Sequence, residues 1–307
     1  MARVPFTRFD AAGNTWIIVA SRDLSLPPSP PRAATAWLGR LAKALCLPRR
    51  GPLTDGLAVI LPPRLAANLA RVRFFNADGS EPEMSGNGIR CAAFWLSEKT
   101  GRVRGLRLET AAGLRVVSAR ARDVGLGEPR GECHYIVRMG RPILNPAKIP
   151  FLGGSGHGPV VAAPLPTRHG AMPVTVTSMG NPHCTVFVGA FGGMNWKKLG
   201  REIERHPLFP NRTNVEFVQV LSRSEIEVHF WERGVGETRS SGTGSCAAVV
   251  AAVLSGRTGR RVRVRTRAGV LEVEWRRSGG VRLTGPVTRV RSGMVAIGGS
   301  AILGARH

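Results

Sequence analysis

Two copies of one short serine- and glycine-rich motif constrain the fold of this chain more than any other feature. The first copy, SGNGIRCAAFW, begins at Ser85, and the second, SGTGSCAAVVAAVL, begins at Ser241, about half the chain further on. Each copy follows an acidic stretch at the end of a strand-like segment, and each runs into an apolar segment that meets a glycine, Gly101 or Gly256. The pattern predicts a tight turn that opens a helix. Its recurrence predicts two homologous halves that face each other, with both turns at the cleft.

The rest of the chain is typical of a protein with many short strands and few helices. Four arginines alternate with other residues from Arg261 to Arg267, and Val262 and Val264 lie between them, which predicts a strand with one wet and one buried face. Further strands are expected at 15–20, 56–61, 71–76, 106–110, 134–140, 174–180, 185–190, 214–220 and 226–233. Helices are expected at about 34–46, 64–70, 89–99, 197–204 and 245–254.

Proline- and glycine-rich segments divide the chain. They lie at 26–31 and 141–170, and the second is near the middle of the sequence. We therefore expect a domain boundary near residue 130. The expected halves are residues 1–132 together with about 286–307, and residues 133–285.

The charge of the chain is strongly basic, with 44 Lys and Arg against 20 Asp and Glu, a formal net charge of +24. Such a field attracts nucleic acid, anionic lipid or small anionic substrates. With one Tyr and 6% aromatic residues, the chain has few side chains on which single-stranded bases could stack. We therefore expect a solvated basic surface and treat nucleic-acid binding as the less favoured interpretation.

Other compositional features indicate a cytoplasmic protein. No stretch of about 18 apolar residues is present, and the N-terminal segment has no apolar signal core. We therefore expect no membrane span. The five cysteines have no CxxC spacing, which indicates reduced thiols rather than a zinc site or a disulfide framework.

A glycine-rich turn that opens a helix is suited to binding an anion. It exposes backbone N–H groups that have no partner within the helix, and the helix dipole adds partial positive charge at the same place. Two such turns facing each other would bind one carboxylate from both sides, with Ser85 and Ser241 beside the neighbouring carbon. This arrangement suits removal of a proton from one face of that carbon and its return to the other face.

Several longer blocks resemble the signature blocks of the diaminopimelate epimerase family. They are FNADGSEPEMSGNGIRCAAF, SMGNPHCTVFV, HPLFPNRTNVEFVQV and FWERGVGETRSSGTGSCAAVV, while DGLAVILPP, MGRPILNPAKIPF and LTGPVTRVRSG resemble its secondary blocks. The resemblance covers roughly residues 6 to 292. It implies an α/β (α+β) fold of two pseudo-symmetric halves, each a mixed sheet wrapped around a central helix, with the active site in the cleft between them.

The resemblance also implies an activity. The family is a group of cofactor-independent isomerases, and its reaction interconverts LL- and meso-diaminopimelate by two-base proton transfer in lysine and peptidoglycan precursor biosynthesis. The implied partner is a small amino-acid substrate, and a homodimer is expected. No metal and no cofactor are implied.

Individual positions acquire roles from the same resemblance. Ser85 and Ser241 occupy the places of two catalytic cysteines, and His183 and Glu232 match groups that orient and tune the catalytic pair. An arginine can hold a carboxylate through two parallel hydrogen bonds, and side-chain amides suit an amino-acid end with both signs of charge. The positions that match substrate contacts are Asn14, Asn76, Asn181, Asn214 and Arg233, and the backbone N–H groups for the reacting carboxylate belong to Gly86, Asn87, Gly242 and Thr243.

Serine at both catalytic positions departs from the family pattern. A thiol has a pKa of about 8.5 and an alcohol lies nearer that of water, about 15.7. The difference of about seven units corresponds to roughly 10 kcal/mol, and a helix dipole supplies only about 2 kcal/mol. Cys91 and Cys246 lie at least a turn inside their helices, where we expect them to pack as small core residues. We therefore expect the serine pair to replace a thiolate acid–base pair poorly.

Three interpretations follow from this departure. The chain is a substrate-trapping double replacement, an inactive homologue that binds an amino acid, or a related isomerase or dehydratase that uses Glu232, His183 or Glu83. The segment FTRFDAAGNTW favours natural divergence, because it has residues that differ from the usual His, Gly, Asp and Phe of the family at Asp10, Ala11, Thr15 and Trp16.

Overall fold

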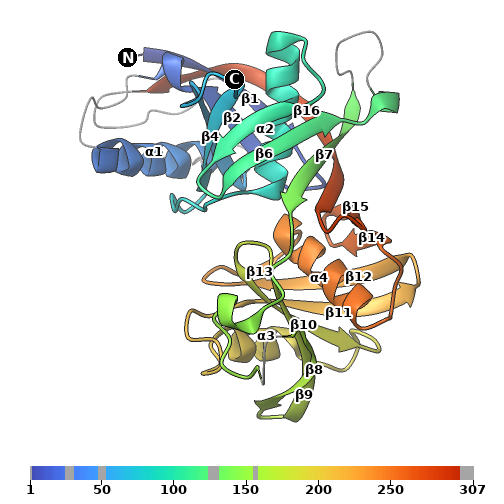
Figure 1. Ribbon diagram of the computed structural model, residues 1–307. Helices are drawn as coiled ribbons and strands as arrows, with labels where there is room; N and C mark the ends of the chain where they lie inside the picture. Colours follow the sequence, from blue (N-terminus) through green and yellow to red (C-terminus); the bar gives the residue numbers. More distant parts are fainter. Residues whose placement is uncertain (1, 25–30, 48–52, 124–130, 155–157, 298–307) are drawn as a thin grey trace. The chain divides into compact units, whose positions relative to one another are not determined.

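The computed structural model describes residues 2–24, 31–47, 53–123, 131–154 and 158–297 (Figure 1). The chain forms two compact units, which are Met1–Val137 with Gly285–His307 (unit 1) and Arg138–Thr284 (unit 2). It passes between them twice, within strand β7 (Glu132–Gly140) and within strand β16 (Val281–Ile297). No helix in the described part of the chain is long and apolar enough to cross a membrane.

Unit 1 is a mixed sheet wrapped around one buried helix, α2 (Gly86–Thr100). This helix contacts β1, β2, β3, β4 and β6, and nearly all of its first three turns are buried. Helix α1 (Pro31–Cys46) packs against β3 and β4, so that β3 is buried along its whole length. The strands are β1 (Ala2–Asp10), β2 (Thr15–Ala20), β3 (Gly56–Leu61), β4 (Ala70–Asn76), β5 (Leu106–Thr110) and β6 (Gly113–Ala119).

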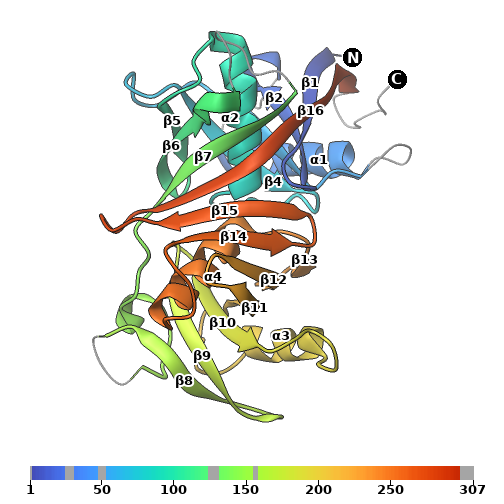
Figure 2. The same ribbon diagram turned by 90° about the vertical axis from the view of Figure 1, so that its right-hand side faces the viewer.

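Unit 2 has the same design around helix α4 (Gly242–Leu254), which contacts six strands of its unit (Figure 2). Because α4 is apolar on all sides, it can be buried inside a curved sheet. Helix α3 (Trp196–Glu204) packs against β11 and β12. The strands are β8 (Val160–Thr167), β9 (Gly170–Ser178), β10 (Pro182–Val188), β11 (Asn214–Ser222), β12 (Glu225–Glu232), β13 (Gly236–Thr238), β14 (Arg261–Thr266) and β15 (Gly269–Trp275).

The two units repeat one strand pattern. From β1 to β6, successive pairs are antiparallel, parallel, antiparallel, parallel and antiparallel. The path β9, β10, β11, β12, β14, β15 has the same order of directions. In each unit a helix connects each of the two parallel pairs, and the second of these helices is the central one. This repetition confirms the predicted pseudo-symmetric halves.

Most of the predicted elements are present. Four of the five predicted helices are α1, α2, α3 and α4, and β14 buries Val262 and Val264 while its arginines are exposed, as expected. The predicted helix at 64–70 is wrong, because this segment forms turns. The carboxylate of Glu109 accepts the backbone N–H groups of Arg64 and Leu65 and the side-chain amide of Asn68, which holds the segment in a non-helical shape. Strands that the sequence patterns did not predict are β1, β6, β8, β13, β15 and β16.

Replacement of Glu109 tests this anchor. The hydrogen bonds from Asn68, Arg64 and Leu65 lower the pKa of the Glu109 carboxyl to about 2. Its contribution to stability is therefore present above the ordinary pKa of a glutamate and is lost as the pH falls toward the lowered value. We expect Glu109→Gln to unfold at lower urea concentration than the parent at pH 7, with the difference shrinking as the pH falls from about 4.5 toward 3. Glu132→Gln, at the exposed start of β7, serves as the control; a pH-independent difference would contradict the anchor.

Candidate active site

The first serine-led turn starts helix α2. Ser85 is the N-cap residue with extended backbone, and its Oγ accepts the backbone N–H of Gly88 at 3.0 Å. A Cβ on Gly88 would lie 2.9 Å from the Phe74 ring and 3.0 Å from the Trp16 ring, so only glycine lets the helix approach the sheet this closely. The N–H groups of Gly86 and Asn87 are in the first turn, where the helix itself provides no acceptor.

The second turn starts helix α4 with the same local structure. Ser241 is the N-cap residue, and its Oγ accepts the backbone N–H of Gly244 at 3.2 Å. A Cβ on Gly244 would lie 2.9 Å from both the Phe230 ring and Oε1 of Glu216. Each predicted turn therefore has the capped, glycine-dependent helix start on which an anion site depends.

The strand registers make the two units comparable residue by residue. In unit 1 Trp16 is opposite Gly56, which is opposite Asn76. In unit 2 His183 is opposite Asn214, and β11 then pairs with β12 so that Glu216 is opposite Phe230. The corresponding pairs are Asn14 and Asn181, Trp16 and His183, Gly56 and Asn214, Ala58 and Glu216, Phe74 and Phe230, Asn76 and Glu232, and Gly88 and Gly244.

In unit 1 the structure brings the predicted residues to the strand ends beside the first turn. The ring of Trp16 touches Gly88, and its Nε1–H donates to Oδ1 of Asn14 at 2.5 Å. Asn76 donates its side-chain amide to Oγ of Ser80 at 2.9 Å. Glu83, the alternative base of this half, is an exposed residue of the loop before Ser85.

A fully buried arginine lies inside the first turn of α2, and the sequence patterns did not single it out. Arg90 is 0% exposed, and its guanidinium donates to the Gly86 carbonyl at 3.0 Å and to Oδ1 of Asn87 at 2.8 Å. It fixes the Asn87 side chain and adds positive charge beneath the turn. The equivalent position in α4 is Cys246, so the turn in unit 2 has no cation at this position.

In unit 2 a chain of buried polar groups lies behind the second turn. His183 is 0% exposed; its Nε2 meets Oδ1 of Asn181 at 3.0 Å and its Nδ1 meets Oε1 of Glu216 at 2.6 Å. Nε2 of His183 therefore faces an oxygen that can only accept a hydrogen bond, and Nδ1 faces the carboxyl of Glu216. The Asn181 amide in turn faces Oγ1 of Thr243 at 3.5 Å. Glu216 was not among the predicted residues, since it lies within an apolar strand.

Two carboxyl groups of unit 2 have raised pKa values. Burial raises the pKa of Glu216, and His183 opposes the shift. Burial likewise raises the pKa of Glu232, and the nearby hydroxyls of Ser241 and Thr238 oppose it. The charge of Glu232 also raises the pKa of Glu216. Carboxyls with pKa values shifted in this way, beside a helix N-terminus, are candidates for proton transfer.

Arg233, the arginine predicted to bind substrate, lies in a turn that hydrogen bonds hold in place. The backbone N–H of Arg233 donates to Oδ1 of Asn214 at 3.0 Å, and the Asn214 amide donates to the Pro182 carbonyl at 2.9 Å. Buried Glu204, at the end of α3, accepts the N–H of Gly234 and Nε1–H of Trp231, both at 2.9 Å. Arg233 itself is exposed, and Nη1 of its guanidinium donates to the Asn211 carbonyl at 3.2 Å.

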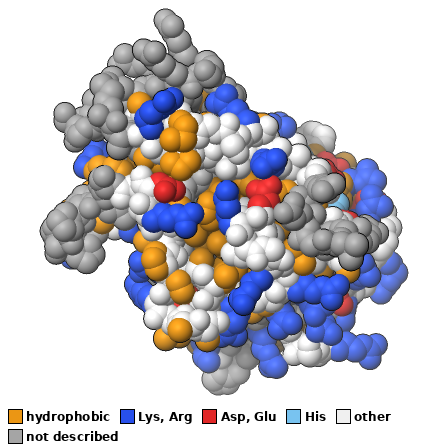
Figure 3. Space-filling model, turned by 90° about the horizontal axis from the view of Figure 1, so that it is seen from above, with side chains coloured by type: hydrophobic (Ala, Val, Ile, Leu, Met, Phe, Trp, Pro, Cys, Tyr) orange, Lys and Arg blue, Asp and Glu red, His pale blue; other side chains and the backbone are white. Residues whose placement is uncertain are grey.

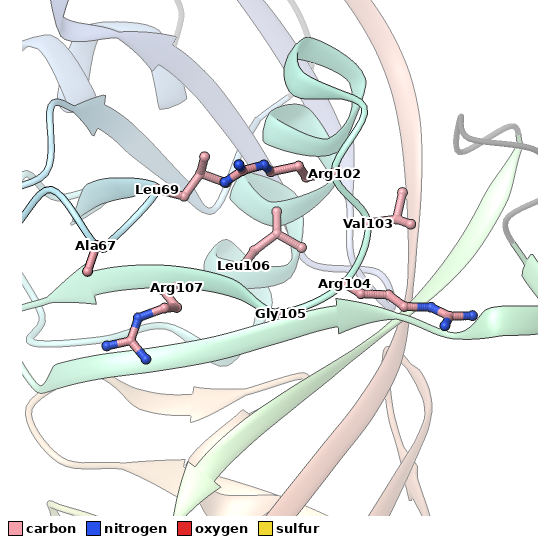
Figure 4. Close-up of a pocket in the computed structure, with 8 residues that line it drawn as sticks. All are labelled: Ala67, Leu69, Arg102, Val103, Arg104, Gly105, Leu106 and Arg107. Atoms are coloured by element: carbon pink, nitrogen blue, oxygen red, sulfur yellow. The ribbon is translucent and has the colours of Figure 1, made fainter.

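A pocket of about 380 Å³ in unit 1 is separate from these groups (Figure 4). Its lining comes mainly from the segment after helix α2, whereas Ser85 is at the other end of that helix. It contains none of the predicted site residues. In the described parts of both units, no group of three or more His, Cys, Asp or Glu residues could hold a metal ion.

The basic charge is spread over the surface, and Figure 3 shows Lys and Arg side chains across much of one face. The alternating arginines of β14 have carboxylate partners close by. Arg261 contacts Glu272 at 2.9 Å, and Arg265 contacts Glu225 at 2.8 Å. These contacts lower the charge that this strand offers to a polyanion.

Solved structures with a matching architecture include a racemase and an epimerase. A probable proline racemase from Agrobacterium radiobacter superposes with a TM-score of 0.68 at 18% identity, over 96% of this chain and 93% of the other. A hydroxyproline epimerase from Agrobacterium vitis gives a TM-score of 0.68 at 17% identity, with the same two coverages. At this identity the likeness shows the fold alone, a two-unit fold that this chain shares with these two proteins.

Sequence comparison identifies the family to which the chain belongs. The family model described as diaminopimelate epimerase matches residues 10–135 and 175–290. The diaminopimelate epimerase of Desulforudis audaxviator is 45% identical over 94% of this chain and 98% of its own length. That of Pelotomaculum thermopropionicum is 41% identical over 94% and 97%. The chain belongs to the diaminopimelate epimerase family.

The cysteines offer a direct test of the site. All five are free and buried; burial raises the pKa of Cys46 to about 12, and it also raises the pKa values of Cys91 and Cys184. We expect no labelling of the native protein by iodoacetamide at pH 8 on the time scale of an exposed thiol, and labelling of all five after unfolding in guanidinium. Mass spectrometry of the digested protein locates the label. Rapid native labelling of Cys91 or Cys246 would show that a thiol is available near a turn.

Proposed function

We propose that this chain binds diaminopimelate, or an amino acid of closely similar size and charge, as its substrate. The observation that carries the proposal is the pair of equivalent serine-capped helix starts, Ser85 at the start of α2 and Ser241 at the start of α4. The first-turn N–H groups of these helices would bind the reacting carboxylate. Arg233 would bind the distal carboxylate as a charge-assisted pair. Membership of the family and relatives named as diaminopimelate epimerases support the choice of substrate.

We further propose that the two-base epimerisation of this substrate is slow in this chain. The first residue of each turn is a serine. Removing the proton from its hydroxyl to form an anionic base costs roughly 10 kcal/mol more than removing it from a thiol. Cys91 and Cys246 cannot replace them, because both are buried within their helices. The reaction that we propose to be slow is the interconversion of LL- and meso-diaminopimelate in lysine and peptidoglycan precursor biosynthesis.

A cytoplasmic location and a homodimer form part of this proposal. Five free, buried cysteines suit a reducing compartment. We do not favour nucleic acid as a partner, because the densest arginine run is a strand with paired charges rather than a groove-reading helix. A salt-dependent mobility shift with nonspecific DNA would favour nucleic-acid binding instead.

Binding of diaminopimelate tests the proposed substrate. We expect calorimetry to show binding of the LL or meso isomer, and Arg233→Ala to weaken it by about tenfold or more through loss of a charge-assisted pair. Arg168→Ala, at the exposed β8–β9 turn, serves as the matched control and should bind like the parent. Absence of binding of both isomers at millimolar concentration would contradict the proposed function.

Restoring thiols tests the role of the serines. We expect the double variant Ser85→Cys, Ser241→Cys to interconvert LL- and meso-diaminopimelate, and the parent to show no conversion in the same assay. Either single variant should convert far more slowly than the double one, because inversion needs an acid and a base on opposite faces. A double variant that binds substrate and stays inert would favour the altered-chemistry interpretation, and rapid conversion by the parent would refute the pKa argument.

A further inference from the structure

Asn14 and Asn181, two of the predicted substrate contacts, are held by the same kind of neighbour. In unit 1 the Nε1–H of Trp16 donates to Oδ1 of Asn14 at 2.5 Å. In unit 2 Nε2 of His183 meets Oδ1 of Asn181 at 3.0 Å. Each ring follows its asparagine by two residues, at the second position of β2 or β10. Because residues two apart on a strand lie on one face, this spacing brings the ring nitrogen to the amide.

The contact with Trp16 determines which end of the Asn14 amide is available to a ligand. An amide carries an acceptor oxygen and a donor NH2 group, and it can present either one by turning over. An indole N–H only donates, so the oxygen of Asn14 must face the ring. Among the described residues none accepts a hydrogen bond from the NH2 group of Asn14, and this half-buried side chain has no nitrogen sealed from solvent without a partner.

The ring of Trp16 cannot turn away from Asn14, because three elements enclose it. Trp16 is 3% exposed, and its ring meets that of Phe74 on β4 edge-on, with 5.8 Å between the centroids. A Cβ on Gly56 of β3 would lie 2.5 Å from the indole, and one on Gly88 of α2 would lie 3.0 Å from it. Glycine at both positions leaves the space that an indole needs.

Unit 2 fills the corresponding space with a smaller ring and a larger neighbour. His183 is opposite Asn214 in the strand register, where Trp16 is opposite Gly56. An imidazole and an asparagine thus take the place of an indole and a glycine. Although these residues differ in size and chemistry, both rings place a nitrogen against the amide oxygen of the asparagine two residues earlier. The position of the ring nitrogen is what the two units share.

We propose that Trp16 is a positioning residue of the substrate site, which holds the Asn14 amide with its NH2 group toward the ligand. Asn14 then binds a carboxylate oxygen of the amino acid and not its ammonium group, because an NH2 group only donates. Trp16 acts through Asn14, as the ring of His183 does through Asn181. The inference rests on the proposed function, since it takes a ligand with carboxylate and ammonium groups at this site.

Two substitutions of Trp16 separate the N–H group from the bulk of the ring. Trp16→Phe keeps an aromatic ring and removes the donor, so we expect the Kd for diaminopimelate to rise about fivefold to tenfold. Trp16→His offers a ring N–H where unit 2 uses one, and we expect it to bind more tightly than Trp16→Phe. A purely structural role predicts the reverse order, because an imidazole is smaller and more polar than a phenyl ring. Calorimetry at pH 8, where imidazole is neutral, measures both.

Asn14→Asp tests the direction of the amide by the sign of its effect. The carboxylate of this variant still accepts the N–H of Trp16 but donates nothing. If Asn14 contacts a carboxylate of the ligand, we expect binding to weaken about tenfold or more, because two negative charges would meet. If it contacts the ammonium group, the new charge pair would tighten binding. Unchanged or tighter binding by Asn14→Asp would overturn the inference.

The same substitution at another tryptophan provides the matched control. Trp275, on β15 of unit 2, donates its Nε1–H to the Gly279 carbonyl at 3.2 Å, and Trp275→Phe should bind like the parent. Urea unfolding of every variant monitors the fold, and Asn14→Asp decides the question where the Trp16 variants are unstable. Parent-like binding by a folded Trp16→Phe, or weaker binding by Trp16→His than by Trp16→Phe, would overturn this inference and leave the proposed substrate intact. No binding of either isomer by the parent would overturn both.

Discussion

The contact on which the rest of the site depends is the close approach of two helix starts to the sheet at Gly88 and Gly244. Any side chain there would collide with Phe74 in one unit and with Phe230 and Glu216 in the other. Because the helices can sit this close, their first-turn N–H groups lie at the strand ends, beside amide side chains carried by neighbouring strands. Serine caps then fix the direction in which each helix begins. The anion binding that we propose would thus follow from backbone packing and would not need a particular side-chain chemistry.

Duplication of this scaffold lets the two units differ where the backbone does not constrain them. The same register carries an indole or an imidazole, and an alanine or a carboxyl, at corresponding positions without altering the strand pairing. Burial then acts on these side chains: it raises the pKa values of Glu216 and Glu232 in unit 2, while unit 1 encloses the cation of Arg90. This difference between the units affects proton transfer because both turns begin with serine. An alcohol needs a neighbouring base to lose its proton, whereas a thiol can ionise by itself.

Local patterns predicted the elements whose shape is set by near neighbours. The serine caps, the glycines and the apolar run that follows gave the starts of α2 and α4, and alternation of Arg with Val gave β14. The segment 64–70 has the composition of a helix but is held in turns by Glu109, which is 45 residues from Arg64. Strands such as β1 and β16 were missed because they are defined by pairing with each other across nearly the whole chain.

The sequence by itself determined that this protein has two serine-led helix starts, the residues that flank them and its family. These are properties of short segments and of long matching blocks, and they do not require the chain to be folded in space. Only the tertiary structure decided which groups stand behind each serine. Glu216 is 33 residues from His183, and Arg90 is directed inward beneath its own turn. Strand register brings Glu216 to His183, and burial directs Arg90 to the start of its own helix. Burial also raises the pKa of Glu216, because the charged carboxylate loses contact with water.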